Sequence, residues 1–524
     1  MNTKKLFMLL AAVLLVSAGL SAQDTEVFTN DGIKYTGDRT TMTATVTGTE
    51  DNFSKTDVVI PEEVNGYVVT CIGARAFRTT SVKSVDMPNT IISIGYRAFS
   101  RCSELETISV SNSLTTIADM AFTECSSLRS IALPETISEI GASSFSECSS
   151  IESIEIPYDA PLETIQQGTF IACSKLASFN IPGSVKIIND TAFGFCSSLT
   201  SLYIPSSVIK LEYDDFGEYH PFYSCSRLES IIVDKENPVY DSRENCNAII
   251  ETSTNKLIVG CMNSNIPNGV VEIGSTAFYG QQSVPSSIEI PGTVTTIGDM
   301  AFSESSLTSI IIPSTVTNMG LSVFNSCESL MSATLPDSWE SIPNSLFIFC
   351  RKLENVKIPA SVKRIEEMAF RRCESLKTID LPNSLEKIGE KAFQGCISMN
   401  SIVLPSNITE IADGAFSNCS GLGSVASKIE EPFEINWNVF AKVYTDASDD
   451  NFTSATLYVP KGTKDKYKAT AGWNKFSIIV EDDEDGIAKI KPQKERCEFY
   501  DLSGRRVSGM KKGINIKDGR KILK

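Results

Sequence analysis

The chain has 524 residues, of which 42% are hydrophobic and 21% charged, and its formal net charge is −17. This hydrophobic content is that of a folded protein and excludes an intrinsically disordered one, and the acidity argues against nucleic acid as a partner. A single histidine excludes metal sites built on histidine pairs and leaves little for a catalytic triad.

The N-terminus has the features of a secretory signal peptide, which we assign to residues 1–22. Two lysines precede an apolar run from Leu6 to Val16, which is too short to span a bilayer comfortably, and small residues lead to a cleavage point after Ala22. An uncleaved anchor is the alternative. We expect an exported protein, secreted or on the outer cell surface, with no transmembrane span after cleavage.

Residues 23–70 contain two alternating stretches, at 27–37 and 41–48, that are broken by glycines. Alternation with glycine breaks is typical of β-hairpins. We predict an N-terminal β cap, because a stack of repeats needs a terminal cover over its first member.

A phenylalanine recurs along most of the remaining chain, at intervals of 22 to 25 residues within two runs. A period in this range is typical of a solenoid, in which each coil packs against its neighbours. We therefore predict a solenoid over residues 71–480. The two runs are Phe99, Phe122, Phe145, Phe170 and Phe193, then Phe302, Phe324, Phe347, Phe370, Phe393, Phe416 and Phe440.

The copy that begins at Phe370 shows what one repeat contains. A cysteine follows the phenylalanine after three residues and a leucine after six, here Cys373 and Leu376. Apolar residues nine and eleven positions on then alternate with polar ones, which indicates a strand with one buried face. Proline at the twelfth position, Pro382 here, ends the strand because it has no backbone N–H to donate.

The pattern Phe-x2-Cys-x2-Leu-x2-Ile-x-Leu-Pro resembles the BspA-like leucine-rich repeats of surface proteins from Bacteroidetes and some protists, over roughly residues 71–460. The resemblance implies a β-rich leucine-rich repeat solenoid. It also implies an exported protein that binds other macromolecules, with adhesion to host matrix proteins as the usual suggestion.

The regular spacing is interrupted between Phe222 and Phe278, which are 56 residues apart. Two apolar runs flank the polar segment Thr252–Asn255. We predict an irregular, protruding or inserted hairpin at about 234–262.

A turn centred on residues 253 and 254 would pair Ile250 with Leu257 and Cys246 with Cys261. Directly opposed strand residues are close enough for a disulfide, which an oxidising compartment favours. Ser-Thr is a poor two-residue turn, however, and a slip of the register would part the cysteines.

After a last strand that ends at Pro460, a short helical piece and Trp473 predict a C-terminal cap. Residues 481–496 form an acidic-to-basic linker. From Gly486 the charge is positive, with twelve Lys and Arg against four Asp and Glu. The predicted β tail, residues 497–524, resembles the C-terminal tails of exported Bacteroidetes proteins, some of which are sorting signals. A leftover β tag is the alternative.

The cysteines come once per repeat and lack the short paired spacing of zinc sites, so we predict that they pack in the core. We expect His220 to be a loop histidine; its approach to Cys225 as a Cys–His nucleophile is the alternative. No phosphate-binding loop or dinucleotide fingerprint is present. We therefore predict no catalytic residue, no metal, no cofactor and no enzymatic activity.

The outward face of the strands is the predicted binding surface. A row of Ser and Thr eight residues after each phenylalanine changes little, whereas the position ten residues after it varies. A protein partner, such as a host extracellular or matrix protein, would be recognised at the variable position. A glycan-capturing accessory protein is the alternative, and a secreted enzyme a weaker one. The candidate partner-binding residues are Glu155, Asn180, Tyr203, Lys357 and Asp380.

Overall fold

The computed structural model describes residues 24–214, 219–281, 287–441 and 454–482, and the backbone of four short strands between 499 and 523. The chain forms two compact units, Met1–Leu330 and Met331–Lys524. The predicted signal peptide and nearly all of the predicted linker lie outside the described residues.

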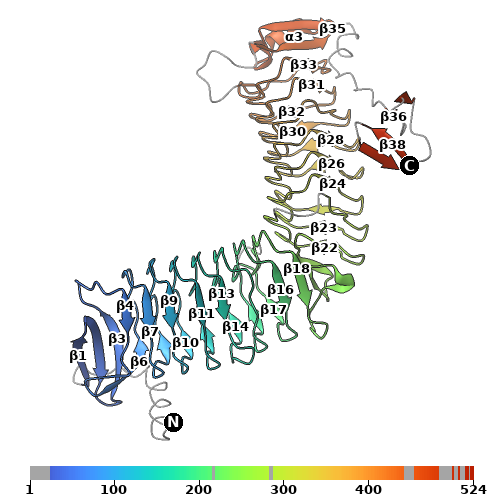
Figure 1. Ribbon diagram of the computed structural model, residues 1–524. Coiled ribbons are helices and arrows are strands. Elements are labelled where there is room, and N and C mark those ends of the chain that lie inside the picture. The colour runs from blue at the N-terminus through green and yellow to red at the C-terminus, as the bar shows by residue number, and fades with distance from the viewer. Residues whose placement is uncertain are drawn as a thin grey trace. The chain divides into compact units, whose positions relative to one another are not determined.

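Five strands make up the N-terminal cap and its junction with the first coil (Figure 1). The first three pair antiparallel, and the third then pairs in parallel with the strand that opens the stack of coils. These strands are β1 (Thr25–Asn30), β2 (Ile33–Asp38), β3 (Thr43–Thr49), β5 (Glu63–Val64) and β6 (Tyr67–Ile72).

The alternating segment after most of the phenylalanines forms a strand, and these strands make up one row, the long row. Its strands pair in parallel and in register, so that Ile131 pairs with Ile154 of the next coil. In the first unit the long row comprises β4 (Asp57–Val59), β7 (Ser84–Asp86), β9 (Thr107–Ser109), β11 (Ser130–Ala132), β13 (Ser153–Glu155), β16 (Ser201–Ile204), β18 (Ser230–Val233) and β24 (Ser309–Ile311). In the second unit it comprises β26 (Ser332–Thr334), β28 (Asn355–Lys357), β31 (Ser401–Leu404), β33 (Ser424–Ser427), β34 (Thr456–Pro460) and β35 (Ile478–Asp482).

A second row of mostly two-residue strands, the short row, closes each coil before the next phenylalanine. Its strands also pair in parallel, as Ile117 does with Ile140. In the first unit it comprises β8 (Ser93–Ile94), β10 (Thr116–Ile117), β12 (Glu139–Ile140), β14 (Thr164–Ile165), β15 (Ile187–Ile188), β17 (Lys210–Leu211), β22 (Glu272–Ile273), β23 (Thr296–Ile297) and β25 (Asn318–Met319). In the second unit it comprises β27 (Ser341–Ile342), β29 (Arg364–Ile365), β30 (Lys387–Ile388) and β32 (Glu410–Ile411).

The phenylalanines stack inside the coils, as the period predicts. Phe99 lies between Phe77 and Phe122, with ring centroids 5.2 Å away on both sides and ring planes within 2° of parallel. In the first unit one cluster of buried residues extends from Ile33 to Cys261. Because each ring is covered by the coils on both sides, no single coil has a core of its own.

The turn around each phenylalanine holds residues with left-handed backbone conformation, which the sequence does not predict. Arg97 and Arg101, on either side of Phe99, have φ angles of 54° and 64°. Non-glycine residues adopt this conformation at an energetic cost. The next coil holds it in place, since the N–H groups of Arg97 and Arg101 donate to the carbonyls of Asp119 (3.2 Å) and Thr123 (2.8 Å).

The irregular segment at about 234–262 folds as a hairpin that joins the stack instead of protruding. Its second strand pairs antiparallel with the first and in parallel with β22 of the short row. The apolar side chains of both strands are buried in consequence. The segment contains β19 (Tyr240–Asp241), the 3-10 turn η1 (Arg243–Asn245), β20 (Ile249–Glu251) and β21 (Lys256–Val259).

The second unit ends in a cap of helical turns, α3 (Lys464–Ala469) and η2 (Trp473–Lys475). The buried Trp473 ring lies 6.0 Å from that of Phe440, the last phenylalanine of the stack, and donates its indole N–H to the Phe433 carbonyl at 2.9 Å. The predicted tail forms short antiparallel strands, β36 (Phe499–Tyr500), β37 (Arg506–Val507), β38 (Ile514–Lys517) and β39 (Arg520–Leu523).

Candidate binding surface

All five predicted partner-binding residues are exposed at the surface. Glu155, Asn180 and Tyr203 belong to the first unit and Lys357 and Asp380 to the second, so we describe them as two separate sets. Asn180 and Asp380 lie at the repeat position of the long row but outside any assigned strand. Their role in binding stays a prediction.

Strand alternation explains the exposure of Tyr203. In β16 the neighbours Leu202 and Ile204 are buried in the core, which turns Tyr203 to the opposite face, where 47% of it is exposed. In the adjacent strand β18 the residue paired with Tyr203 is Ile232, which is 53% exposed. Two large apolar side chains therefore lie side by side on the outside of the sheet.

A carboxylate fixes the orientation of the Tyr203 ring. The phenolic O–H donates to Asp234 Oδ2 at 2.6 Å, and Asp234 Oδ1 accepts the backbone N–H of Glu236. The hydrogen bond raises the pKa of Tyr203 to about 12 and lowers the pKa of Asp234, because it favours the neutral phenol beside the ionised acid. Tyr203 is thus held in one pose, which reduces the entropy lost when a partner binds.

A second tyrosine, which the sequence analysis missed, extends this apolar surface. Tyr158 is 65% exposed, and a Cβ added at Gly183 would lie 2.5 Å from its ring, so the ring covers the bare glycine backbone. Gly183 occupies the same repeat position as Tyr158, thirteen residues after the phenylalanine, one coil later. A tyrosine followed one period later by glycine was the signal that could have revealed the contact. We call Tyr158, Tyr203 and Ile232 the tyrosine patch.

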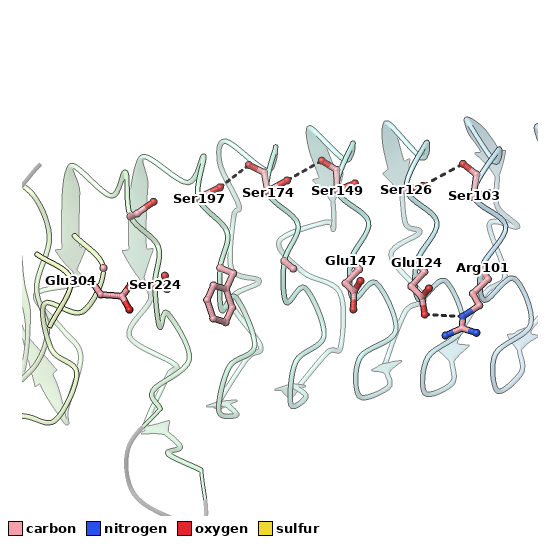
Figure 2. A pocket seen from close by; sticks show the side chains of 14 residues that line it. Arg101, Ser103, Glu124, Ser126, Glu147, Ser149, Ser174, Ser197, Ser224 and Glu304 are labelled. Carbon is pink, nitrogen blue, oxygen red and sulfur yellow. Dashed lines mark hydrogen bonds and ion pairs between the residues drawn. The ribbon is translucent and has the colours of Figure 1, made fainter. Parts of the chain in front are cut away.

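A groove on the first unit lies outside the long-row positions. It has a volume of about 780 Å³, and its lining comes from residues two and four positions after successive phenylalanines. Figure 2 shows these as two rows, with serines in one and Arg101, Glu124 and Glu147 in the other. We call it the two-row groove.

The cysteines of the ladder are buried, as predicted, and most of them also donate a hydrogen bond to the carbonyl of a phenylalanine one coil earlier. The Cys225 thiol lies 3.2 Å from the carbonyl oxygen of Phe193, and burial raises its pKa to about 12. A thiol with so high a pKa stays protonated and is a poor nucleophile. Among the described residues, no three His, Cys, Asp or Glu side chains are placed to hold a metal ion.

His220 lies in a loop, as predicted, and its side chain is buried there, which the sequence did not indicate. Its Nδ1 accepts the N–H of Phe222 at 3.2 Å, and its Nε2 lies 3.4 Å from the Thr276 carbonyl. Burial lowers the pKa of His220 to about 4, so the ring is neutral at pH 7 and Nε2 carries the proton. His220 therefore ties together two coils that are far apart in the sequence.

The hairpin register departs from the predicted one near the cysteines. Ile250 pairs with Leu257 as expected, but a bulge pairs Ile249 with Val259, which shifts the register by one residue. Cys246 and Cys261 are both free, buried thiols, and the Cys261 thiol lies 3.2 Å from the carbonyl of Asn247. A disulfide between the two stays a prediction.

The family model described as "BspA type Leucine rich repeat region (6 copies)" matches residues 70–200, 150–260, 256–374 and 340–455. The chain belongs to this family. The parallel strand rows and the repeat of about 23 residues are thus those of BspA-type leucine-rich repeats, as the sequence pattern indicates.

Solved structures of leucine-rich repeat proteins are similar to this chain. A leucine-rich cell surface protein from Faecalibacterium prausnitzii is 25% identical, with a TM-score of 0.55, over 77% of this chain and 94% of its own. A leucine-rich repeat protein from Bacteroides ovatus is 26% identical, with a TM-score of 0.47, over 76% of this chain and 94% of its own. No curated protein matched the chain. Over the described residues, no helix has the length and hydrophobicity needed to cross a bilayer.

Proposed function

We propose that this protein is exported to the cell surface or secreted, and that it binds a protein partner, a host extracellular or matrix protein, through the outer face of the long row. Membership of the BspA-type family and similarity to a cell-surface protein support the location. The tyrosine patch supports the mode of binding, and it is the observation on which the proposal rests.

The patch has the chemistry of a protein-binding hot spot. Tyrosine is enriched at hot spots because its ring buries a large apolar area while its hydroxyl keeps a polar partner. Here Tyr158 lies against Gly183 and Tyr203 is fixed by Asp234, so the two rings are positioned before binding. Exposed Glu155, in the coil of Tyr158, and Asn180, in the next coil, provide the polar rim that such interfaces have.

The test is binding of the mature protein to a panel of immobilised extracellular matrix proteins, with a glycan array alongside. For the matrix protein that binds in this panel, we expect Tyr203→Ala to lower the affinity about 30-fold or more, as loss of a hot-spot side chain does. The matched control is Ile311→Ser, which removes a 68% exposed side chain at the same repeat position outside the patch. Lys357→Ala tests the second unit in the same way.

Equal binding by wild type, Tyr203→Ala and Lys357→Ala, with unchanged melting, would reject the long row as the binding face. Binding to glycans without binding to any matrix protein would favour glycan capture instead.

A further inference from the structure

The two-row groove carries chemistry that the proposed function does not use. It extends over coils marked by Phe99 to Phe302 in the first unit. One row consists of serines four residues after the phenylalanines from Phe99 to Phe222. The other includes Arg101, Glu124, Glu147, Phe195 and Glu304, two residues after their phenylalanines.

The serine row presents hydrogen-bond acceptors to the groove. Ser174 donates its hydroxyl to the carbonyl of Ser149 at 3.3 Å, and Ser197 donates to the carbonyl of Ser174 at 3.4 Å (Figure 2). A hydroxyl has one proton and two lone pairs. Because the proton is used along the stack, the lone pairs of these oxygens remain for a ligand that donates.

The facing row has more acid than base. The Arg101 Nε–H donates to Glu124 Oε1 at 2.9 Å, and Glu304 Oε1 accepts the phenolic O–H of Tyr279 at 2.6 Å. The Glu147 carboxylate, between them, has no hydrogen-bond or ion-pair partner among the described residues, and it is exposed. The middle of the groove is therefore rich in acceptors and carries unneutralised negative charge.

Phe195, two coils after Glu147 in the same row, adds an aromatic face to the groove. Its ring makes an edge contact with Tyr223, at 5.3 Å and 83°, and the residue is 47% exposed. In the second unit the equivalent position is Phe349, and there Arg371 covers the ring with its guanidinium carbon 5.8 Å from the centroid. In the first unit no cation is recorded over Phe195 within the described residues.

The next coil of the second unit shows the same chemistry. Arg372, two residues after its phenylalanine, lies 3.7 Å from the carboxylate of Glu374, four residues after it. The chain thus covers an aromatic ring and a carboxylate at these two repeat positions with its own guanidinium groups in the second unit. In the first unit Phe195 and Glu147, each two residues after its phenylalanine, are an aromatic ring and a carboxylate with no such guanidinium group over them among the described residues.

We propose that the two-row groove binds an extended, arginine- and lysine-bearing segment of another protein. Guanidinium and ammonium groups donate only, which suits the serine and glutamate acceptors, and they bind to aromatic faces by cation–π attraction. The net charge of −17 adds long-range attraction for such a segment. Eight coils at about 4.8 Å span about 35 Å, which about ten extended residues would fill.

The spacings also predict how selective the groove is. Side chains on one face of an extended peptide recur at about 6.6 Å, whereas the acceptors recur once per coil, at about 4.8 Å. Because the two spacings differ, successive peptide side chains cannot each pair with the acceptors of one particular coil. The groove selects basic composition more than sequence, and its affinity falls with salt.

The test uses the mature protein and a fluorescent decapeptide of alternating arginine and serine, followed by fluorescence anisotropy. The matched control peptide replaces arginine with citrulline, which keeps the shape and removes the charge. We expect the arginine peptide to bind and the citrulline peptide to bind at least tenfold more weakly. Raising the salt from about 50 to 500 mM should weaken the arginine peptide further.

Two variants probe the groove itself. Glu147→Gln and Phe195→Ala should each weaken the arginine peptide about two- to fivefold, the effect of one exposed charge or cation–π contact. The repeat position of Phe195 is occupied by Ala172 one coil earlier, so the fold accepts alanine at this position. Glu155→Gln, an equal change of charge on the long row, and Tyr203→Ala should leave peptide affinity unchanged.

Equal binding of the arginine and citrulline peptides would overturn the proposal, as would unchanged affinity in both groove variants. Displacement of the peptide by neutral oligosaccharides would also overturn it, because it would assign the groove to a glycan. None of these outcomes bears on the tyrosine patch, which is tested by matrix-protein binding.

Discussion

The Cys125 thiol donates to the carbonyl oxygen of Phe99, one coil earlier, at 3.1 Å. The same oxygen accepts the backbone N–H of Cys102 at 3.1 Å, so it has one partner within its coil and one from the next. Cys125 therefore joins two coils by a hydrogen bond while it fills the core. The sequence predicts its burial, and the structure adds the bond.

Cys125→Ala should lower the free energy of unfolding by about 1–3 kcal/mol, from a small cavity and a lost hydrogen bond. Urea unfolding followed by circular dichroism measures this. The control is Ser103→Ala, an exposed serine one residue after the neighbouring Cys102, which should cost less than about 0.5 kcal/mol. Equal stability of the two variants would show that the thiol contributes nothing.

The buried thiols should resist alkylation in the native protein. Burial raises the pKa of Cys225 to about 12, far above the usual value of about 8.5, so almost no thiolate forms at pH 8. Mass spectrometry after iodoacetamide should find Cys225 unmodified in folded protein and modified in urea. Since the folded state favours the protonated thiol, stability from this group is full below about pH 8.5 and is lost as the pH rises toward 12. Rapid labelling at pH 8 would contradict the burial.

His220 should make the first unit sensitive to acid. Its pKa is lowered to about 4 in the folded state, from about 6.5 when unfolded, so its contribution is present above pH 6.5 and lost as the pH falls toward 4. The shift corresponds to about 3 kcal/mol between pH 7 and pH 4. Unfolding free energies at several pH values would show a smaller loss in His220→Gln, which cannot titrate. Parallel pH profiles for the two proteins would be evidence against the buried neutral ring.

Phe370→Ala should cost about 3–5 kcal/mol, the range for emptying a packed aromatic site. The ring lies between those of Phe347 and Phe393, with centroids at 5.6 and 5.3 Å, and it is fully buried. Trp437→Ala in the same unit removes a larger ring that is mostly exposed, and we expect it to cost less than about 1 kcal/mol. A cost below about 1 kcal/mol for Phe370→Ala in thermal unfolding would place that ring outside the core.

Gly183→Ala should displace Tyr158 from the tyrosine patch without emptying the core, because the new Cβ would meet its ring at 2.5 Å. Nitration of Tyr158, read by peptide mass mapping, should become faster as the ring leaves the surface. At Gly292 an added Cβ meets nothing within 4 Å, so Gly292→Ala is the matched control. An unchanged nitration rate in Gly183→Ala would mean that the ring does not lie on the glycine.

The sequence predicts most of this fold because its main signals are repeated. The recurring phenylalanine identifies the stack, and the alternation around Leu202 and Ile204 correctly turns Tyr203 outward. What it misses depends on the register between coils. Neither the cover of Gly183 by Tyr158 nor the burial of His220 is visible within a single repeat, because each partner lies in another coil.

The left-handed residues are missed for a different reason. Met120, like Arg97, is of a type that disfavours positive φ, yet its φ is 56°. Hydrogen bonds to the next coil stabilise this conformation, and residue preferences alone do not predict such bonds. The hairpin bulge between Ile249 and Ile250 was also missed, in a hairpin whose second strand, β21, pairs with β22 of another coil.

The in-register pairing of neighbouring coils, such as Ile117 with Ile140, has an evolutionary consequence. Coils that pair in this way offer the same edge to their successors, so unequal recombination among them can insert or remove a whole period and leave both new junctions compatible. Such a gene can lengthen or shorten its product in steps of one coil, and each step changes which surface residues are displayed while the joints remain the same.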